Sequence, residues 1–177
     1  MPRRIAWFLI LPLCAGLVPQ LCGQDQGDLT PDEVQQIRDN AINPNDRIKL
    51  FIKFDDERID ELKQLAGGPK DNVGNAQVRD KLEEFTSLCD ELQDNVDTYD
   101  SAHADIRKSL KDVIAATARW SQAINALPPS PNYEFSQKTA LDSVQSAQDD
   151  AKQVAREQGI FFQIHKKMRG RNGSAPD

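Results

Sequence analysis

The chain of 177 residues is poor in the residues that carry most protein chemistry, with three cysteines and two histidines. It contains no Cys-x-x-Cys-His sequence for haem attachment, no Gly-x-Ser-x-Gly sequence for a nucleophilic serine and no glycine-rich phosphate loop. The alternation of polar and apolar residues that marks a β-strand is also missing. These absences argue against covalent cytochromes, serine hydrolases and nucleotide-binding proteins, and against β-structure.

Long apolar runs are scarce as well. The one candidate, residues 5–18, is about 14 residues long, whereas a membrane-spanning helix needs roughly 20. It follows Arg3 and Arg4 and precedes a polar region that begins near Gln24, which is the layout of a secretory signal peptide. We therefore expect residues 1–23 to be a signal peptide and the mature chain to be secreted or periplasmic, without stable membrane insertion. An uncleaved amino-terminal anchor is the alternative.

Cysteine usage fits that expectation. Cys14 and Cys22 lie in the expected signal peptide, and neither follows the Leu-small-small sequence of a lipidated cysteine. Removal of residues 1–23 leaves Cys89 alone, so no disulfide can form within the mature chain. Cys89 occupies an apolar position, which predicts a small buried side chain rather than a reactive thiol.

Basic residues are outnumbered, with 22 Lys and Arg against 28 Asp and Glu and a net charge of −6. An acidic chain without a basic face is not expected to bind nucleic acid. Residues 24–169 are long enough for one hydrophobic core and too short for two ordinary domains. We expect one helical domain over this range and a disordered tail over residues 170–177.

Apolar residues at helical spacing are abundant. The most extensive set, here called the heptad stripe, advances in alternating steps of four and three, with no Gly or Pro between Gly74 and Pro128. Its members are Val78, Leu82, Phe85, Cys89, Leu92, Val96, Tyr99, His103, Ile106, Leu110, Val113, Thr117, Trp120, Ile124 and Leu127. Trp120 is the side chain expected to anchor the packing.

Three further helices are predicted. Thr30 and Glu33 predict a capping box that opens a short helix. Asn43 predicts the cap of a second helix that runs to about Ala66. Its apolar stripe comprises Ile48, Phe51, Ile52, Ile59, Leu62 and Leu65. A last helix is predicted from about Tyr133, and its own four-three stripe comprises Ala140, Val144, Ala147, Ala151, Val154, Gln158, Phe161, His165 and Met168.

The pattern leaves two arrangements open for residues 75–127. Its unbroken phase favours one continuous helix. A bend near Asp100, with Asp100 or Ser101 as a cap, would give helices of similar length that cover more apolar surface. We therefore expect an all-α fold, an antiparallel up-down four-helix bundle with a short extra amino-terminal helix. An elongated three-helix arrangement, with residues 75–127 as one continuous helix, is the alternative.

Few polar residues are expected to point inward, so we predict no catalytic, cofactor-binding or metal-binding residue and no cofactor. Asp100 and His103 come nearest to the Glu-x-x-His sequence of di-iron bundles, in a single copy. His165 and Met168 are expected to overshoot His103 along an antiparallel helix, which argues against a shared haem. The stripe positions where chemistry remains open are Cys89, Tyr99, His103 and Thr117.

A set of carboxylates, here called the acidic stripe, runs beside the heptad stripe. It comprises Asp80, Glu83, Asp90, Asp94 and Asp97. Such a stripe can collect divalent cations. Pairing with lysines of the second helix is the simpler expectation, and the lysines concerned are Lys49, Lys53 and Lys63.

Two further groups can bind a ligand or a surface. The aromatic side chains Tyr99, Trp120, Phe161 and Phe162 can line a cleft for a hydrophobic ligand, although their stripe spacing predicts a place in the core. The basic residues between Lys166 and Arg171 can touch an anionic membrane surface.

The segment Leu29-Thr30-Pro31-Asp32-Glu33, with Val34-Gln35-Gln36-Ile37-Arg38 after it, resembles the Leu-Thr-x-x-Gln helix start of small periplasmic chaperones and stress sensors of the Spy and CpxP type. Glu33 stands where that family has Gln. The resemblance covers about ten residues, implies a chaperone or envelope-stress function and carries over no site residue.

The sequence thus predicts a non-enzymatic protein-interaction or structural module of the cell envelope. Its partner is an unknown protein or a second copy that packs against leftover stripe surface. A Spy/CpxP-like chaperone and a carrier of a ligand or metal in the bundle interior are the alternatives.

Overall fold

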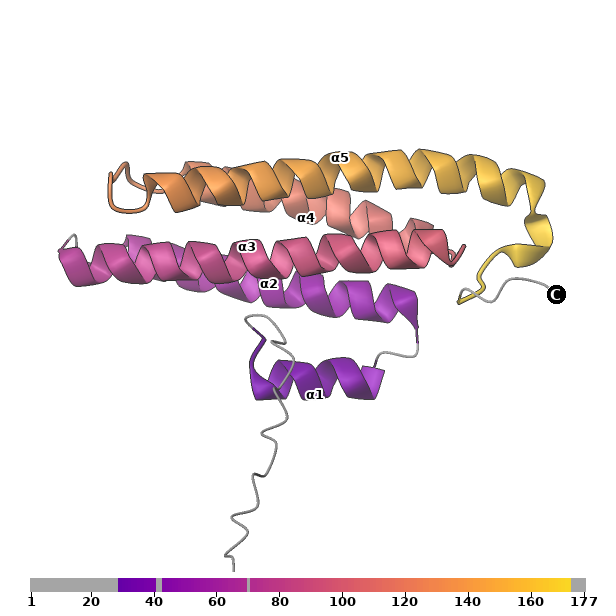
Figure 1. Ribbon diagram of the computed structural model, residues 1–177, viewed down its shortest axis with the longest axis horizontal. Coiled ribbons are helices and arrows are strands. Elements are labelled where there is room, and N and C mark those ends of the chain that lie inside the picture. The colour runs from indigo at the N-terminus through magenta and orange to yellow at the C-terminus, as the bar shows by residue number, and fades with distance from the viewer. Residues whose placement is uncertain (1–28, 41–42, 70, 173–177) are drawn as a thin grey trace, which may run out of the picture.

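The computed structural model describes residues 29–40, 43–69 and 71–172 (Figure 1). Its helices are α1 (Pro31–Asn40), α2 (Pro44–Ala66), α3 (Asn72–Ser101), α4 (Arg107–Asn125) and α5 (Glu134–Ile164), followed by a 3-10 turn over Lys166–Met168. No strand occurs in the described ranges, and the all-α expectation is confirmed. The expected signal peptide, residues 1–23, lies outside them. None of the helices described is long and apolar enough to cross a membrane.

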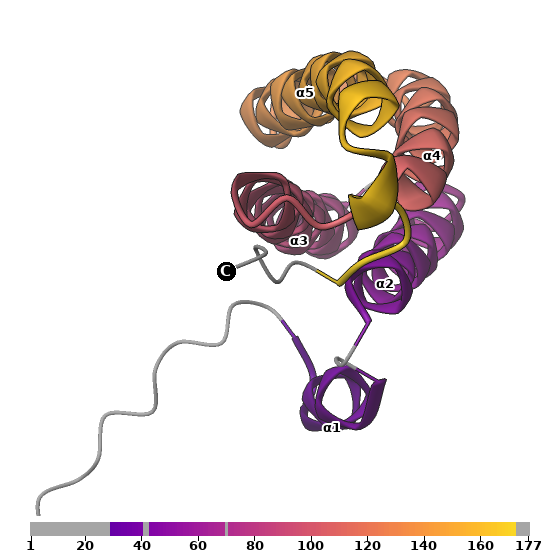
Figure 2. The same cartoon turned by 90° about the vertical axis from the view of Figure 1, so that its right-hand side faces the viewer.

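Helices α2 to α5 pack side by side in a ring (Figure 2). α2 contacts α3 and α4, and α5 contacts the same two helices. α2 and α4 run in one direction and α3 and α5 in the other (Figure 1). α3 and α4 are diagonal to each other, with no pair of Cα atoms within 8 Å. In a simple up-down order each helix would lie beside the next along the chain, so the structure differs from that order at the α3–α4 connection.

Residues 102–106 break the helix that the unbroken stripe allowed, so the continuous helix over residues 75–127 is not observed. Gln158 of α5 stabilises the break because its side chain satisfies backbone groups that the helix leaves open. Its Oε1 accepts from Ile106 N at 3.2 Å, and its Nε2 donates to Ala104 O at 2.9 Å. His103 takes a left-handed conformation with φ of 53°.

The prediction that Asp100 or Ser101 caps the helix after the break was wrong. Asp100 accepts a hydrogen bond from Gln158 Nε2 at 2.9 Å, and the cap position of α4 is Ile106, without a side-chain hydrogen bond. Asp100 and Ser101 both belong to the last turn of α3, which ends before the connection turns. The first turn of α4 is therefore held by neighbouring helices instead of a local cap.

The helix starts predicted near the amino terminus are confirmed. Thr30 N donates to Glu33 Oε2 at 2.7 Å and Glu33 N to Thr30 Oγ1 at 3.3 Å, which is a reciprocal capping box. Asn43 Oδ1 accepts from Asn45 N at 3.0 Å at the start of α2. The capping box by itself accounts for Thr30 and Glu33 in the segment that resembles Spy and CpxP.

α1 lies along α2 and contacts none of the other described helices (Figure 1). Arg58 of α2 holds it through two hydrogen bonds of 2.8 Å to the two carboxylate oxygens of Glu33. Both side chains are buried. Burial alone would raise the pKa of Glu33, but the hydrogen bonds from Arg58 and Thr30 outweigh it and the pKa lies below its usual value.

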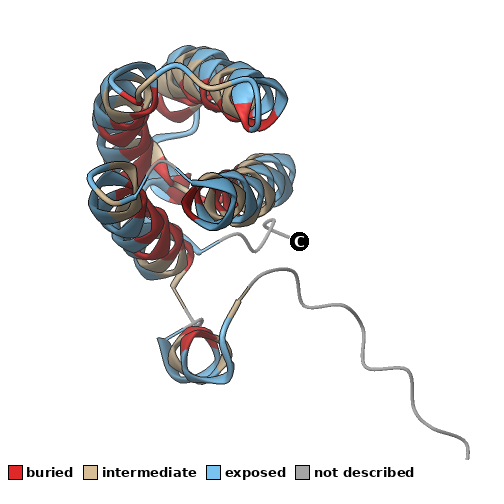
Figure 3. Ribbon diagram, turned by 90° about the vertical axis from the view of Figure 1, so that its left-hand side faces the viewer, coloured by how far each residue is buried: buried red, intermediate tan, exposed pale blue. Residues whose placement is uncertain are grey.

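The three predicted apolar stripes supply the core, and their buried residues turn toward the inside of the ring (Figure 3). Five stripe members are not buried, namely Leu65, Tyr99, His103, Phe161 and His165. Because the rest are used within the chain, little stripe surface is left for a second copy. Trp120 is fully buried as expected, and its ring meets Phe85 edge-on across the diagonal, with centroids 5.6 Å apart.

The first two residues of the expected disordered tail, 170 and 171, instead form hydrogen bonds with Asp105. Gly170 N donates to Asp105 Oδ2 at 2.9 Å, and Arg171 O accepts from Asp105 N at 3.0 Å. These bonds tie residues 170–171 to the α3–α4 connection because that connection exposes polar groups that α5 does not cover. Residues 173–177 lie outside the described part of the chain.

Candidate functional site

α3 and α5 are parallel neighbours, and polar side chains face each other along their contact. Ser136 Oγ donates to Glu83 Oε1 at 2.9 Å, and Ser143 Oγ donates to Asp90 Oδ1 at 2.5 Å. Each pair is 53 residues apart in the chain, the constant offset that two parallel helices in register produce. α5 therefore presents serine hydroxyls at the places where α3 presents carboxylates.

A cavity of about 410 Å³ opens beside these pairs. We call it the α3–α5 groove, and it is lined by Glu83, Thr86, Ser87, Asp90, Phe135, Ser136 and Thr139. Phe135 stands at this groove with 82% of its surface exposed. Two carboxylates, four hydroxyls and one open aromatic ring suit a protein segment with a cation and an apolar side chain.

The expected pairing of the acidic stripe with lysines of α2 is wrong. Those three lysines pair within their own helix: Lys49 with Asp46, Lys53 with Glu57 and Lys63 with Asp60. The physical reason is the angular position of the stripe, which faces α5 and solvent while α2 covers another side of α3. The pairs that do link α2 with α3 use Lys81 with Glu61 and Arg58 with Glu84.

At the carboxyl-terminal end of the acidic stripe, Asp97 lies among other carboxylates. Burial raises the pKa of Asp97, and the negative charges of Asp150, Asp94 and Asp100 raise it further. Over the described residues, no group of three or more His, Cys, Asp or Glu is arranged to hold a metal ion. The cation-collecting function weighed for this stripe thus gains no support from side-chain geometry.

A buried carboxyl that the sequence reading missed lies in the middle of the core. Asp55 of α2 is fully buried, and neither of its carboxyl oxygens has a hydrogen-bond partner among the described residues. Burial raises its pKa well above the usual value, and the charge of Asp56 adds to the effect. The signal was present, because Asp55 falls on the four-three steps that join Ile52 to Ile59.

Cys89 is buried and free, as its position in the heptad stripe predicts. Burial raises the pKa of its thiol far above the usual value, and the nearby Asp55 carboxyl raises it further. Because the thiolate is the nucleophile, this thiol is held in its unreactive form. Thr117 is also buried, and its hydroxyl donates to Val113 O at 3.0 Å within its own helix.

The two histidines meet on one aromatic ring. His103 and His165 stack on Phe161 with centroid distances of 4.6 and 4.3 Å, and Phe162 meets Phe161 edge-on. Phe161 lies one helical turn before His165, so His165 still lies beyond the position of α5 that faces His103, as expected. Phe162 is fully buried, whereas both histidines are exposed. The stack occupies the ring faces at the end of α5, and Tyr99 lies half-buried elsewhere on α3.

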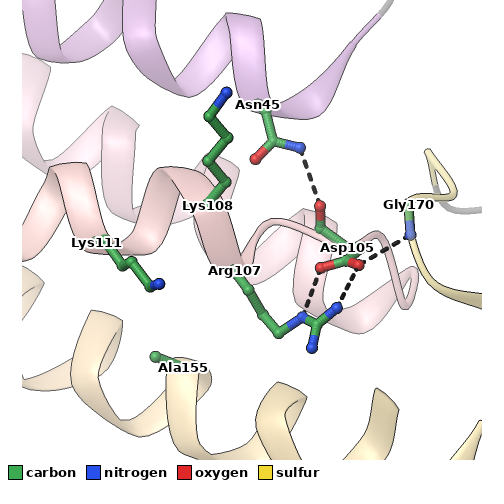
Figure 4. A pocket seen from close by; sticks show the side chains of 7 residues that line it. All are labelled: Asn45, Asp105, Arg107, Lys108, Lys111, Ala155 and Gly170. Carbon is green, nitrogen blue, oxygen red and sulfur yellow. Dashed lines mark hydrogen bonds and ion pairs between the residues drawn. The ribbon is translucent and has the colours of Figure 1, made fainter. Parts of the chain in front are cut away.

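A second cavity, of about 560 Å³, lies where α4 begins (Figure 4). Its lining residues are Asn45, Asp105, Arg107, Lys108, Lys111, Ala155 and Gly170. The carboxylate of Asp105 lies at this cavity and accepts two hydrogen bonds from the guanidinium of Arg107, at 2.8 and 2.7 Å. The Arg107 hydrogen bonds lower the pKa of Asp105 more than its burial raises it. This carboxylate therefore neutralises one of the cavity's cations.

Comparison of the chain with protein-family models, with curated proteins and with solved structures found no match.

Proposed function

We propose that this chain is a secreted, non-catalytic protein-interaction module of the cell envelope. In this proposal residues 24–169 form a four-helix bundle with a short extra amino-terminal helix, in which α3 and α5 are parallel neighbours, and the α3–α5 groove binds a partner protein. The ring of contacts among α2 to α5 and their alternating directions support the bundle. The sequence layout of residues 1–23 supports export.

The observation that carries the interaction function is the position of Phe135. This ring is 82% exposed beside a cavity, whereas Trp120, Phe85 and Phe162 are fully buried and Tyr99 and Phe161 are partly buried. Covering a phenylalanine contributes about 1.5–3 kcal/mol of burial free energy. Aromatic side chains are also enriched at the centres of protein interfaces.

Charge defines the partner. Glu83 and Asp90 border the groove, and a serine hydroxyl of α5 orients each carboxylate. Glu83 also forms an exposed ion pair with Arg79 at 3.9 Å, so Asp90 carries the less compensated charge. A partner segment with Lys or Arg next to an apolar residue complements this surface. The partner we propose is thus a protein with a basic, partly apolar segment.

The proposal that the protein is not an enzyme rests on the two side chains in the core that carry reactive groups. Cys89 is buried with its thiol held protonated, and Asp55 is fully enclosed. Neither can meet a substrate without the helices opening. Interaction through the surface is the simpler use of this fold.

The test is affinity purification of the tagged protein from its own host cells, with quantitative mass spectrometry of what copurifies. The groove variant combines Glu83→Gln with Asp90→Asn, and a second variant carries Phe135→Ser. The matched control combines Glu157→Gln with Asp112→Asn, which removes one Glu and one Asp from exposed sites outside the groove.

We expect one dominant copurifying protein whose recovery falls at least tenfold in both groove variants and stays unchanged in the control. A partner that is recovered equally with all variants would place the interface elsewhere. A protein that recovers no partner and stays monomeric at all concentrations would refute the interaction function.

A further inference from the structure

Charge is unevenly distributed over this acidic protein. The segment 152–172 contains a single acidic residue, Glu157, and six basic ones, namely Lys152, Arg156, Lys166, Lys167, Arg169 and Arg171. Apart from Lys152, all of these basic side chains are exposed. Lys166, Lys167, Arg169 and Arg171 follow the end of α5, where the chain turns back (Figure 2), and Lys152 and Arg156 lie in the carboxyl-terminal half of that helix. We call this surface the basic end.

Apart from Lys152, the cations of the basic end have no carboxylate partner among the described residues. Along α2, Lys49, Lys53 and Lys63 each pair with an acidic residue. Of the described residues of the basic end, Lys152 alone forms an ion pair, with Asp149. Positive charge that the protein does not neutralise itself is available to an anionic partner.

Exposed apolar side chains adjoin these cations. Ile160 is 62% exposed and Ile164 is 73% exposed. They are four residues apart and therefore lie one above the other on one face of α5, with Arg156 one turn before them. Lys166 and Lys167 follow directly. Neighbouring isoleucines beside unpaired cations form an amphipathic surface.

We propose that the basic end docks on the surface of an anionic lipid bilayer. Ile160 and Ile164 enter the interfacial region, and the basic side chains contact lipid phosphates. A bilayer suits this surface because it offers negative charge and apolar volume together. The groove begins near Phe135, at the other end of α5, so it stays accessible on a docked molecule.

The test is cosedimentation of the protein, in the form isolated from its own cells, with two kinds of vesicle. One contains phosphatidylcholine alone and the other contains phosphatidylcholine with phosphatidylglycerol. A retained apolar amino-terminal segment would bind both kinds alike, so the neutral vesicles separate that effect. Two variants probe the surface, Lys166→Gln with Lys167→Gln, and Ile160→Ser with Ile164→Ser. Their controls are Lys138→Gln with Lys63→Gln, and Val73→Ser, since Val73 is 66% exposed on α3.

We expect binding to anionic vesicles that weakens with added salt, and little binding to neutral ones. The paired lysine variant should lower the affinity on the order of tenfold, and the paired isoleucine variant should do the same. The controls should bind like the parent chain, and circular dichroism should show all variants equally helical.

Three results would overturn the proposal. The first is equal binding to neutral and anionic vesicles. The second is an equal loss of affinity in the control variants. The third is no vesicle binding together with a self-association that the Lys166→Gln, Lys167→Gln variant abolishes, since that would identify a second copy as the occupant.

Discussion

Ser143 of α5 donates a hydrogen bond of 2.5 Å to Asp90 of α3, and the same offset of 53 residues joins Ser136 to Glu83. Serine supplies a donor without supplying a charge. The serines therefore hold the two carboxylates in place beside the groove without placing a cation on them. This relationship connects the parallel packing of α3 and α5 with the acidic surface to which we assign partner binding.

The buried acid of α2 predicts an unusual dependence of stability on pH. Because burial raises the pKa of Asp55 in the folded chain, the folded state keeps a proton that the unfolded state has already lost. The free energy of unfolding should therefore fall as pH rises from the usual carboxyl range toward the folded-state pKa. Each unit by which the pKa of Asp55 in the folded state exceeds that in the unfolded state lowers the free energy of unfolding by about 1.4 kcal/mol.

Asp55→Asn removes that titration with almost no change in shape. We expect this variant to be more stable than the parent at pH 7 and to lose the dependence described above. Urea denaturation at several pH values measures both effects, with Asp60→Asn as an exposed control on the same helix. A parent chain that is more stable at neutral pH than at pH 5, or an Asp55→Asn variant that is less stable, would show that Asp55 has a partner in solution.

The ion pair between Glu33 and Arg58 should be what holds α1 in place, because α1 packs on α2 alone among the described helices. Arg58→Met leaves the Glu33 carboxylate buried without its counter-charge, a change that typically costs 3–5 kcal/mol. We expect the amides of α1 to lose protection from hydrogen exchange while those of α3 retain it. Lys63→Met, which breaks an exposed pair, should leave α1 protected.

Trp120 should be coupled energetically to Asp56. Its indole Nε1 donates to Asp56 Oδ1 at 2.7 Å, while its ring packs against Phe85. Trp120→Phe keeps an aromatic ring and removes the donor, so we expect a loss of about 1–3 kcal/mol in the free energy of unfolding. In a chain that already carries Asp56→Ala, Trp120→Phe should lower the free energy of unfolding by at least about 0.5 kcal/mol less than it does in the parent chain. If the effects of the two substitutions simply add, the contact between Trp120 and Asp56 is contradicted.

Thiol titration tests the burial of Cys89 and the expected processing together. In the folded protein its thiol should resist thiol reagents, since it is buried and held protonated. After denaturation, a chain that has lost residues 1–23 should titrate a single thiol. Three thiols would show that Cys14 and Cys22 remain, and rapid reaction in the folded state would show that Cys89 is accessible.

The caps of α1 and α2, which depend on residues close together in the chain, could be predicted from the sequence. Contacts between residues far apart in the chain could not. Thr30 and Asn43 open helices through contacts within a few residues, so their effect can be read directly. The break after Ser101 depends on Gln158, which comes from a helix 50 residues further on. Asp55 was missed because the reading of α2 followed apolar residues, although the spacing placed it among them.

The acidic stripe shows the same limit for the candidate site. Its five carboxylates were predicted to share one side of a helix, but the neighbour they face depends on the diagonal placement of α3 and α4. That placement assigns α5, with Ser136 and Ser143, to the position where lysines of α2 were expected. No local pattern in the sequence carries this information.

The most direct test of the account is site-specific photocrosslinking in the cells that produce the protein. A crosslinking residue replaces Thr139 at the α3–α5 groove in one version and Gln122, exposed on α4, in the other. The account predicts one crosslinked partner protein from position 139, its loss when Phe135→Ser is added, and no such product from position 122. Equal crosslinking from both positions, or none from position 139, would contradict the claim that the groove is the interaction site.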